Sequence, residues 1–119
     1  MSPVARLAVA PVSALPPAES ADWRYRLDPA ELAYCFGLRR AAEHLAARAL
    51  ARHAVAAALG CGEVPWRDIA VRRAPSGQPA VLLSDRLDEW RRRRGIGVPG
   101  VSLSHAAGHA AALAWLGDS

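Results

Sequence analysis

Two arginines and a histidine stand in an alanine-rich stretch, LAARALARHAVAAALG at residues 45–60, where a packing helix would carry leucine or isoleucine. On a helix, Arg48 and Arg52 share a stripe with Val55, and His53 lies about a quarter-turn round. A guanidinium on an apolar face must meet water, a carboxylate or a bound anion, because burying it unpaired is costly. Two interpretations therefore stay open: an anion-binding helix face, or arginines paired with acids elsewhere in the domain. His53 likewise reads as an acid–base group or as a neutral surface ring.

The composition indicates one domain, residues 1–119, with a positive surface. Of the 119 residues, 15 are Lys or Arg and 11 are Asp or Glu, so we expect an acidic partner. The arginine run WRRRRG at residues 90–95 reads most simply as a solvated helix end. The hydrophobic content leans on alanine, which buries little area, so we expect a second subunit to complete the apolar surface. Cys35 and Cys61 are expected to be free thiols.

The periodicity and turn residues predict an α+β fold. Residues 6–12 alternate as a strand does, and Asp28, Pro29 and Glu31 form a helix start with a capping box. Gly37 should break that helix, and a long helix should run from about residue 38 to 59. Further predictions, in chain order, are a hairpin within residues 66–83, a helix opened by Ser84 or Asp85, and strands at residues 101–105 and 109–116. The last segment is also compatible with a helix, and we take it as a strand.

Four motifs in order, LAARALARHAVAAALG, WRDIAV, SGQP and VSLSH, resemble the small holo-acyl-carrier-protein synthases of the phosphopantetheinyl transferase superfamily. AELAYC also resembles the segment before the family's motif helix. The likeness runs from about residue 28 onward, with a weaker match at residues 7–15. It implies a cytoplasmic homotrimer in which a long helix packs on a small antiparallel sheet. It also implies coenzyme A bound between subunits, with its phosphopantetheine arm transferred to a serine of an acidic acyl carrier protein.

The resemblance implies site residues of two kinds. For coenzyme A they are Arg48, Arg52, Gly77, Gln78, Pro79, Ser104 and His105. The candidates for catalysis are His53, Arg52 and His105, with either histidine as general base for the carrier-protein serine. Taken singly, SGQP reads as a tight turn and SLSH as a plain strand end.

The metal site is where the sequence departs from the family. The resemblance calls for two carboxylates around a divalent ion, because oxygen ligands suit magnesium. Ala10 aligns with the family's aspartate and His53 with its glutamate, while Ala57 aligns with a second lysine. A single imidazole is a poor magnesium ligand. We therefore expect no metal ligands here and no Mg²⁺-dependent transfer of the family's kind.

Two functions follow. In the first, the cleft binds coenzyme A, a carrier protein or a carrier-derived, polyketide-like molecule; the family's metal-dependent transfer is lost, and the chain has a different catalytic role or an accessory one. In the alternative, the chain is an active 4′-phosphopantetheinyl transferase whose arginines replace the metal's charge. Nucleic acid is not favoured, because no recognised nucleic-acid-binding motif is present. No segment is long and apolar enough for a membrane span, and prolines interrupt the N-terminal stretch, which argues against a signal peptide.

Overall fold

The computed structural model describes residues 4–117, and it confirms the predicted α+β architecture. The strands are β1 (Val4–Pro11), β2 (Ile69–Arg73), β3 (Pro79–Leu83), β4 (Gly100–Ala106) and β5 (His109–Leu116). The helices are α1 (Trp23–Arg26), α2 (Pro29–Phe36), α3 (Ala41–Leu59) and α4 (Asp85–Arg93), with short 3-10 turns at η1 (Val12–Ala14) and η2 (Trp66–Asp68).

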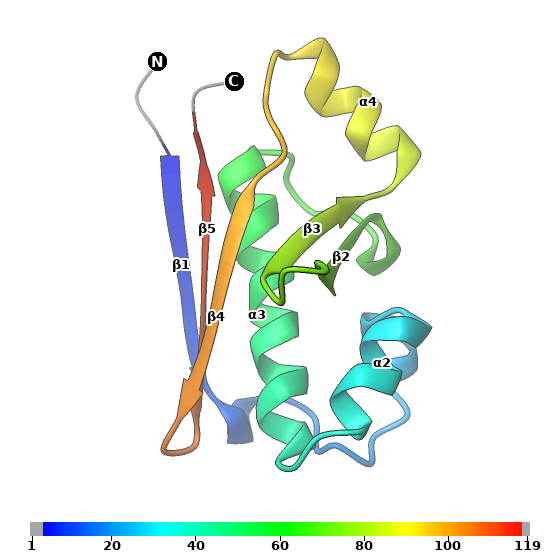
Figure 1. Cartoon of the computed structure of the whole chain (residues 1–119), viewed down its shortest axis with the longest axis vertical. Coiled ribbons are helices and arrows are strands. Elements are labelled where there is room, and N and C mark those ends of the chain that lie inside the picture. Colours follow the sequence, from blue (N-terminus) through cyan, green and yellow to red (C-terminus); the bar gives the residue numbers. More distant parts are fainter. Residues whose placement is uncertain (1–3, 118–119) are drawn as a thin grey trace.

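The long helix α3 stands between two antiparallel sheets. The larger sheet has the strand order β1-β5-β4, and the smaller is the β2-β3 hairpin. In Figure 1, α3 runs between the larger sheet and the hairpin, α2 lies beside its lower half, and α4 connects β3 to β4. The segment at residues 109–116 is therefore a strand, as predicted, and it takes the centre of the larger sheet because it pairs on both edges.

The two faces of the larger sheet differ in the size of their side chains. Ala8 and Ala10 of β1 pair with Ala112 and Ala110 of β5, and these small residues pack in the core against α3. The opposite face carries large apolar side chains, which alternate with the alanines and are exposed: Leu7, Val9, Leu113 and Trp115. Small side chains on this face of β1 and β5 allow α3 to pack closely against those two strands.

The helix boundaries follow local signals. The predicted capping box is present, with the Asp28 carboxylate accepting from the Glu31 amide and the Glu31 carboxylate accepting from the Asp28 amide. Gly60, which follows α3, adopts a left-handed φ of 70°, as a helix-ending glycine does. At the other end, α3 begins at Ala41, later than the predicted position near residue 38. Arg40 interrupts the helix there with a φ of 57°.

A second, smaller core lies under the N-terminal segment. It consists of the buried residues Trp23, Leu27, Cys35, Leu45 and Ala49. The indole Nε1 of Trp23 donates a 3.0 Å hydrogen bond to the carbonyl of Pro17, which anchors the proline-containing loop. The single-turn helix α1 was not predicted, because four residues are too few for a periodic pattern. Both cysteines are free thiols, as predicted.

Among the residues that the structure describes, no helix is long and apolar enough to cross a membrane.

Candidate functional site

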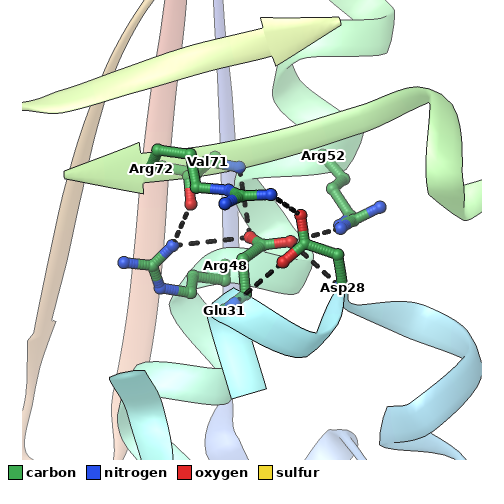
Figure 2. A network of polar contacts seen from close by, with 6 residues as sticks. All are labelled: Asp28, Glu31, Arg48, Arg52, Val71 and Arg72. Atoms are coloured by element: carbon green, nitrogen blue, oxygen red, sulfur yellow. Dashed lines mark hydrogen bonds and ion pairs between the residues drawn. The ribbon is translucent and has the colours of Figure 1, made fainter. Parts of the chain in front are cut away.

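Arg48 and Arg52 of the alanine-rich helix α3 meet on one buried carboxylate. Glu31 of α2 is fully enclosed and accepts an ion pair from Arg52 on one oxygen and from Arg48, at 3.4 Å, on the other. The backbone amide of Val71 in β2 donates a further hydrogen bond of 3.1 Å to Glu31. Figure 2 shows the carboxylate between the two guanidinium groups, with the backbone of Val71 on another side. The structure thus reveals the acid with which these arginines pair.

The arginines stay charged in this buried cluster. Burial lowers the pKa of Arg52 from its ordinary value, whereas the neighbouring Glu31 carboxylate acts in the opposite direction. An arginine side chain nevertheless keeps its proton in proteins. Beside the cluster, burial raises the pKa of the Cys35 thiol to about 11, although the positive charge of Arg48 lowers it. Cys35 is therefore an uncharged packing residue at neutral pH.

Arg48 is held on several sides. Its guanidinium donates to the carbonyl of Val71 and lies 4.8 Å from the ring centroid of Tyr34 in a cation–π contact. Arg73 lies over the same ring at 5.3 Å. This arrangement brings positive charge from α3 and β2 together around one aromatic side chain of α2.

A cavity of about 220 Å³ opens beside Arg48 and has a basic wall. Its lining residues are Tyr34, His44, Ala47, Arg48, Arg73, Gly77, Pro79, Ser102, Leu103 and His105. Two arginines and two histidines line one small space, and none of its lining residues within the described part of the chain is a carboxylate. This set suits an anionic ligand such as a phosphate group. We call this space the basic cavity.

The histidines of the basic cavity are held in defined positions. Nδ1 of His105 lies 2.8 Å from a carboxylate oxygen of Glu43, and the ring of His105 packs edge-on against His44 at 4.5 Å. Burial lowers the pKa of His44, and the charges of His105 and Arg48 lower it further. Because Glu43 engages Nδ1 of His105, Nε2 is the ring nitrogen that such a geometry presents to other partners.

Arg52 and His53 line a different cavity, of about 300 Å³. Its other lining residues are Ala56, Gly62, Glu63, Val64, Pro65 and Ile69. His53 is exposed, whereas Arg52 is buried. We call this space the His53 cavity. Each cavity takes one arginine from α3, and Arg48 and Arg52 stand about one helical turn apart.

The structure therefore divides the predicted site residues. Arg48, Gly77, Pro79 and His105 line the basic cavity, and Arg52 with His53 lines the His53 cavity. Gln78 and Ser104 are exposed and line neither of them.

Sequence reasoning missed several residues that shape the site. Glu31 was read only as a capping residue, and Glu43, His44, Tyr34 and Arg73 were not assigned to the site. One sequence signal did exist: His44 and Arg48 are spaced four apart and so share a helix face. For Glu31 no local signal existed, because its partners lie 17 and 21 positions further along the chain.

The two positions that the resemblance aligns with metal-binding carboxylates, Ala10 and His53, carry no carboxylate in this chain. Ala10 lies in β1 opposite Ala110, with no oxygen ligand in its side chain. Among residues 4–117, no group of three or more His, Cys, Asp or Glu side chains is placed to hold a metal ion. We accordingly assign no chemical step to a metal.

Relatives with known names resemble this chain over most of its length. It is 43% identical over 93 residues to a holo-[acyl-carrier-protein] synthase of Moorella thermoacetica, covering 76% of this chain and 73% of the relative. It is 36% identical over 88 residues to the synthase of a Geobacter species, covering 71% and 70% of the two chains. No family model matches the chain.

Solved structures share the fold over nearly the whole chain. The synthase of Neisseria meningitidis superposes with a TM-score of 0.83 at 20% identity, covering 96% of this chain and 97% of that one. The synthase of Helicobacter pylori, solved in complex with coenzyme A, gives a TM-score of 0.78 at 20% identity, covering 96% and 100%. The Mycobacterium tuberculosis synthase gives 0.72 at 28% identity, covering 97% and 96%. With relatives of this identity and coverage, the chain belongs to the holo-acyl-carrier-protein synthase family of phosphopantetheinyl transferases.

Proposed function

We propose that this chain is a 4′-phosphopantetheinyl transferase that converts an apo acyl carrier protein into its holo form. The observation that carries the proposal is the 43% identity to a named synthase over 73% of that relative's length. This identity supports the transferase alternative better than a cleft turned to another use. The basic cavity adds a chemical reason, because its wall suits the phosphates of coenzyme A.

Coenzyme A is proposed to bind with a phosphate against Arg48, Arg73 and His105. The turn at Gly77 and Pro79 forms one edge of the cavity. A guanidinium can bind a phosphate through two parallel hydrogen bonds, which favours a fixed orientation. Support comes from the Helicobacter pylori synthase, whose fold is the same and whose structure holds coenzyme A.

His105 is the residue that we propose as general base. The serine hydroxyl of the carrier protein would attack the phosphorus next to the pantetheine arm, and its proton would pass to Nε2 of His105. The new oxygen–phosphorus bond forms as the bond between the two phosphates of coenzyme A breaks, and the electron pair leaves on adenosine 3′,5′-bisphosphate. Glu43 on Nδ1 favours this role because it fixes which ring nitrogen accepts the proton. His53, in the other cavity, is the alternative base.

Arg52 is proposed to supply positive charge toward the reacting phosphates from the His53 cavity. Arginine can stabilise the charge that develops during phosphoryl transfer.

A homotrimer is proposed as the active assembly. The exposed face of the larger sheet carries Leu7, Val9, Leu113 and Trp115 from two adjacent strands. A continuous apolar face of this kind indicates an interface in a chain of this size. Sedimentation of the purified chain should give three times the monomer mass, and Leu7→Asp should shift it to the monomer.

An acidic carrier protein is the proposed partner. Arg39 and Arg40, in the exposed turn before α3, and the exposed arginines of α4 offer positive charge to it. Docking through them should weaken as salt is raised, because exposed charges are screened.

The test of transfer is the intact mass of an apo carrier protein after incubation with this chain and coenzyme A, with magnesium, with manganese and with a chelator. A gain of one phosphopantetheine supports the proposal. Its loss in His105→Gln but not in His109→Gln assigns the base, because His109 is an exposed histidine that lines neither cavity. No gain, beside a known synthase that succeeds in the same buffer, overturns the proposed activity.

Binding without transfer is the second candidate, and one observation favours it: Ala10 and His53 stand where the resemblance places metal-binding carboxylates. In that case calorimetry would detect coenzyme A binding while the carrier protein kept its apo mass. His53→Ala would then leave coenzyme A binding unchanged and alter whatever activity the cleft has gained.

A further inference from the structure

Glu31 is enclosed by four hydrogen-bond donors from three elements. One carboxylate oxygen accepts from the guanidinium of Arg52 and from the backbone amide of Asp28, at 3.3 Å. The other accepts from Arg48 at 3.4 Å and from the backbone amide of Val71 at 3.1 Å. The side chain has no solvent-exposed surface. Its position is thus determined by α2, α3 and β2 together.

Each arginine that Glu31 holds forms part of a different cavity wall. Arg48 lines the basic cavity, and Arg52 lines the His53 cavity. Since both guanidinium groups contact the same carboxylate, the direction of each depends on Glu31. Figure 2 shows them on opposite sides of it.

The charge of the cluster is not balanced by Glu31 alone. Two guanidinium groups share one carboxylate, and the neighbouring Asp28 is taken by Arg72 at 2.6 Å. A carboxylate, Glu63, lines the His53 cavity, whereas Arg48 and Arg73 bring positive charge to the basic cavity. A guanidinium held in fixed orientation at the basic cavity suits recognition of a phosphate.

We propose that Glu31 is a positioning residue of the transferase site, which sets the orientation of Arg48 and Arg52 and, through Arg48, presents a guanidinium to an anionic substrate in the basic cavity. This inference rests on the proposed function, since it assumes coenzyme A as that substrate. Glu31 contacts no substrate itself and acts through Arg48, whereas the enclosed guanidinium of Arg52 holds Glu31 from the other side. Loss of the Glu31 charge should consequently weaken anion binding in the basic cavity.

Three variants separate positioning from simple stabilisation. Glu31→Gln keeps the shape and removes the charge, and Glu31→Asp keeps the charge but withdraws the oxygens by one methylene. Asp68→Asn is the matched control, because Asp68 is also a buried carboxylate that pairs with an arginine, Arg86, and it lines neither of the two cavities. Thermal unfolding of all three gives the stability loss against which binding is compared.

The first readout is the side-chain NMR signals of Arg48 and Arg52, which need no ligand. In the parent chain both guanidinium groups should show slow rotation and protected Nε–H signals. In Glu31→Gln the chemical shifts of both signals should move to those of free arginine, and in Glu31→Asp they should change. In Asp68→Asn they should stay the same. If Glu31→Gln and Glu31→Asp both keep the two signals unchanged, Glu31 does not position the arginines.

The second readout is coenzyme A affinity by calorimetry, followed by KM and kcat in the transfer assay. Glu31→Asp should raise the Kd about tenfold, as expected for a weakened charge-assisted contact, and Asp68→Asn should stay within about twofold. If Glu31→Asp and Asp68→Asn weaken coenzyme A binding equally at matched stability, Glu31 has only a structural role and the inference is overturned. If the parent chain itself binds no coenzyme A, the proposed function fails, and the NMR readout still decides whether Glu31 positions the arginines. Should Glu31→Gln fail to fold, Glu31→Asp carries both readouts.

Discussion

The arginines of α3 and the last two arginines of α4, Arg92 and Arg93, lie in opposite environments, although both groups sit in helices. Arg48 and Arg52 are buried, 5% and 4% exposed, and share one carboxylate from another element. On α4, Arg92 and Arg93 have side chains that are 70% and 73% exposed and pair within their own helix with Asp88 and Glu89. The first pattern needs tertiary structure to exist, whereas the second needs only helical spacing.

This difference decides how much each ion pair matters. An exposed pair between residues three or four apart contributes little, because water and salt screen it and two long side chains must be ordered. A buried carboxylate with two guanidinium groups leaves uncompensated charge in the core when it is removed. The same residue type is thus dispensable in one helix and structural in the other.

The largest effect is expected for Glu31→Ala. This substitution should lower the free energy of unfolding by about 3–5 kcal/mol, because the buried guanidinium groups of Arg48 and Arg52 lose the carboxylate that they share. Urea denaturation, with Arg93→Ala as the exposed control, measures it. A loss below about 1 kcal/mol would mean that the ion pairs of the α3 arginines contribute no more to the free energy of unfolding than the exposed pairs of α4 do.

The next effect concerns the thiol beside the buried arginines. The unfolded Cys35 thiol titrates at its ordinary pKa of 9.0, and the folded one at about 11. Between these values the unfolded chain has lost a proton that the folded chain keeps. The free energy of unfolding should therefore fall as pH rises from 9 to 11, by about 2–3 kcal/mol, and level off above. The difference between parent and Cys35→Ala unfolding curves across this range isolates the effect, and parallel curves would contradict it.

A smaller loss is expected for Arg52→Met. Glu31 would keep Arg48 and the amides of Asp28 and Val71 as partners, so the free energy of unfolding should fall by only about 1–2 kcal/mol. Chemical denaturation of Arg52→Met and Glu31→Ala under the same conditions compares the two losses in the free energy of unfolding. A loss as large as that of Glu31→Ala would show that Arg52 alone satisfies the carboxylate.

The smallest effect is expected on α4. Arg92→Ala and Arg93→Ala should each cost about 0.3–0.5 kcal/mol at low salt, and the cost should vanish in about 1 M NaCl, where the Debye length is about 3 Å. Unfolding curves at the two salt concentrations give this directly. If the loss in the free energy of unfolding persisted in high salt, these exposed pairs would behave like the buried pairs of Glu31 with Arg48 and Arg52.

Much of the architecture could be predicted because its signals are local. The start of α2 is predicted by Asp28, Pro29 and Glu31. The prediction was correct, including the two reciprocal hydrogen bonds of the capping box. The alternation in residues 109–116 was ambiguous against their alanine content, and it was resolved as a strand because β5 pairs on both edges. Tertiary context overrides propensity in such a segment. The start of α3 was placed too early, since Arg40 gives no sequence signal for its left-handed backbone.

The candidate site could be predicted only in part. A family resemblance pointed to Arg48, Gly77, Pro79 and His105, and the structure brings these four to one cavity. It could not show that Arg52 and His53 line another cavity, nor that Glu43 holds His105. Such contacts join residues that are far apart in the chain, and no periodicity records them.

By itself the sequence determined that the chain is α+β, where α2 begins, where α3 ends, and that two arginines on an apolar helix face require a partner. Capping, turn chemistry and desolvation act on neighbouring residues or on single side chains, so they can be read along the chain. Only the tertiary structure decided that the partner is Glu31, which meets Arg48, Arg52 and Val71 across separations of 17, 21 and 40 positions. Packing chose among several acids with equal chemistry, because the arrangement of α2, α3 and β2 brings Glu31 against Arg48, Arg52 and the Val71 amide.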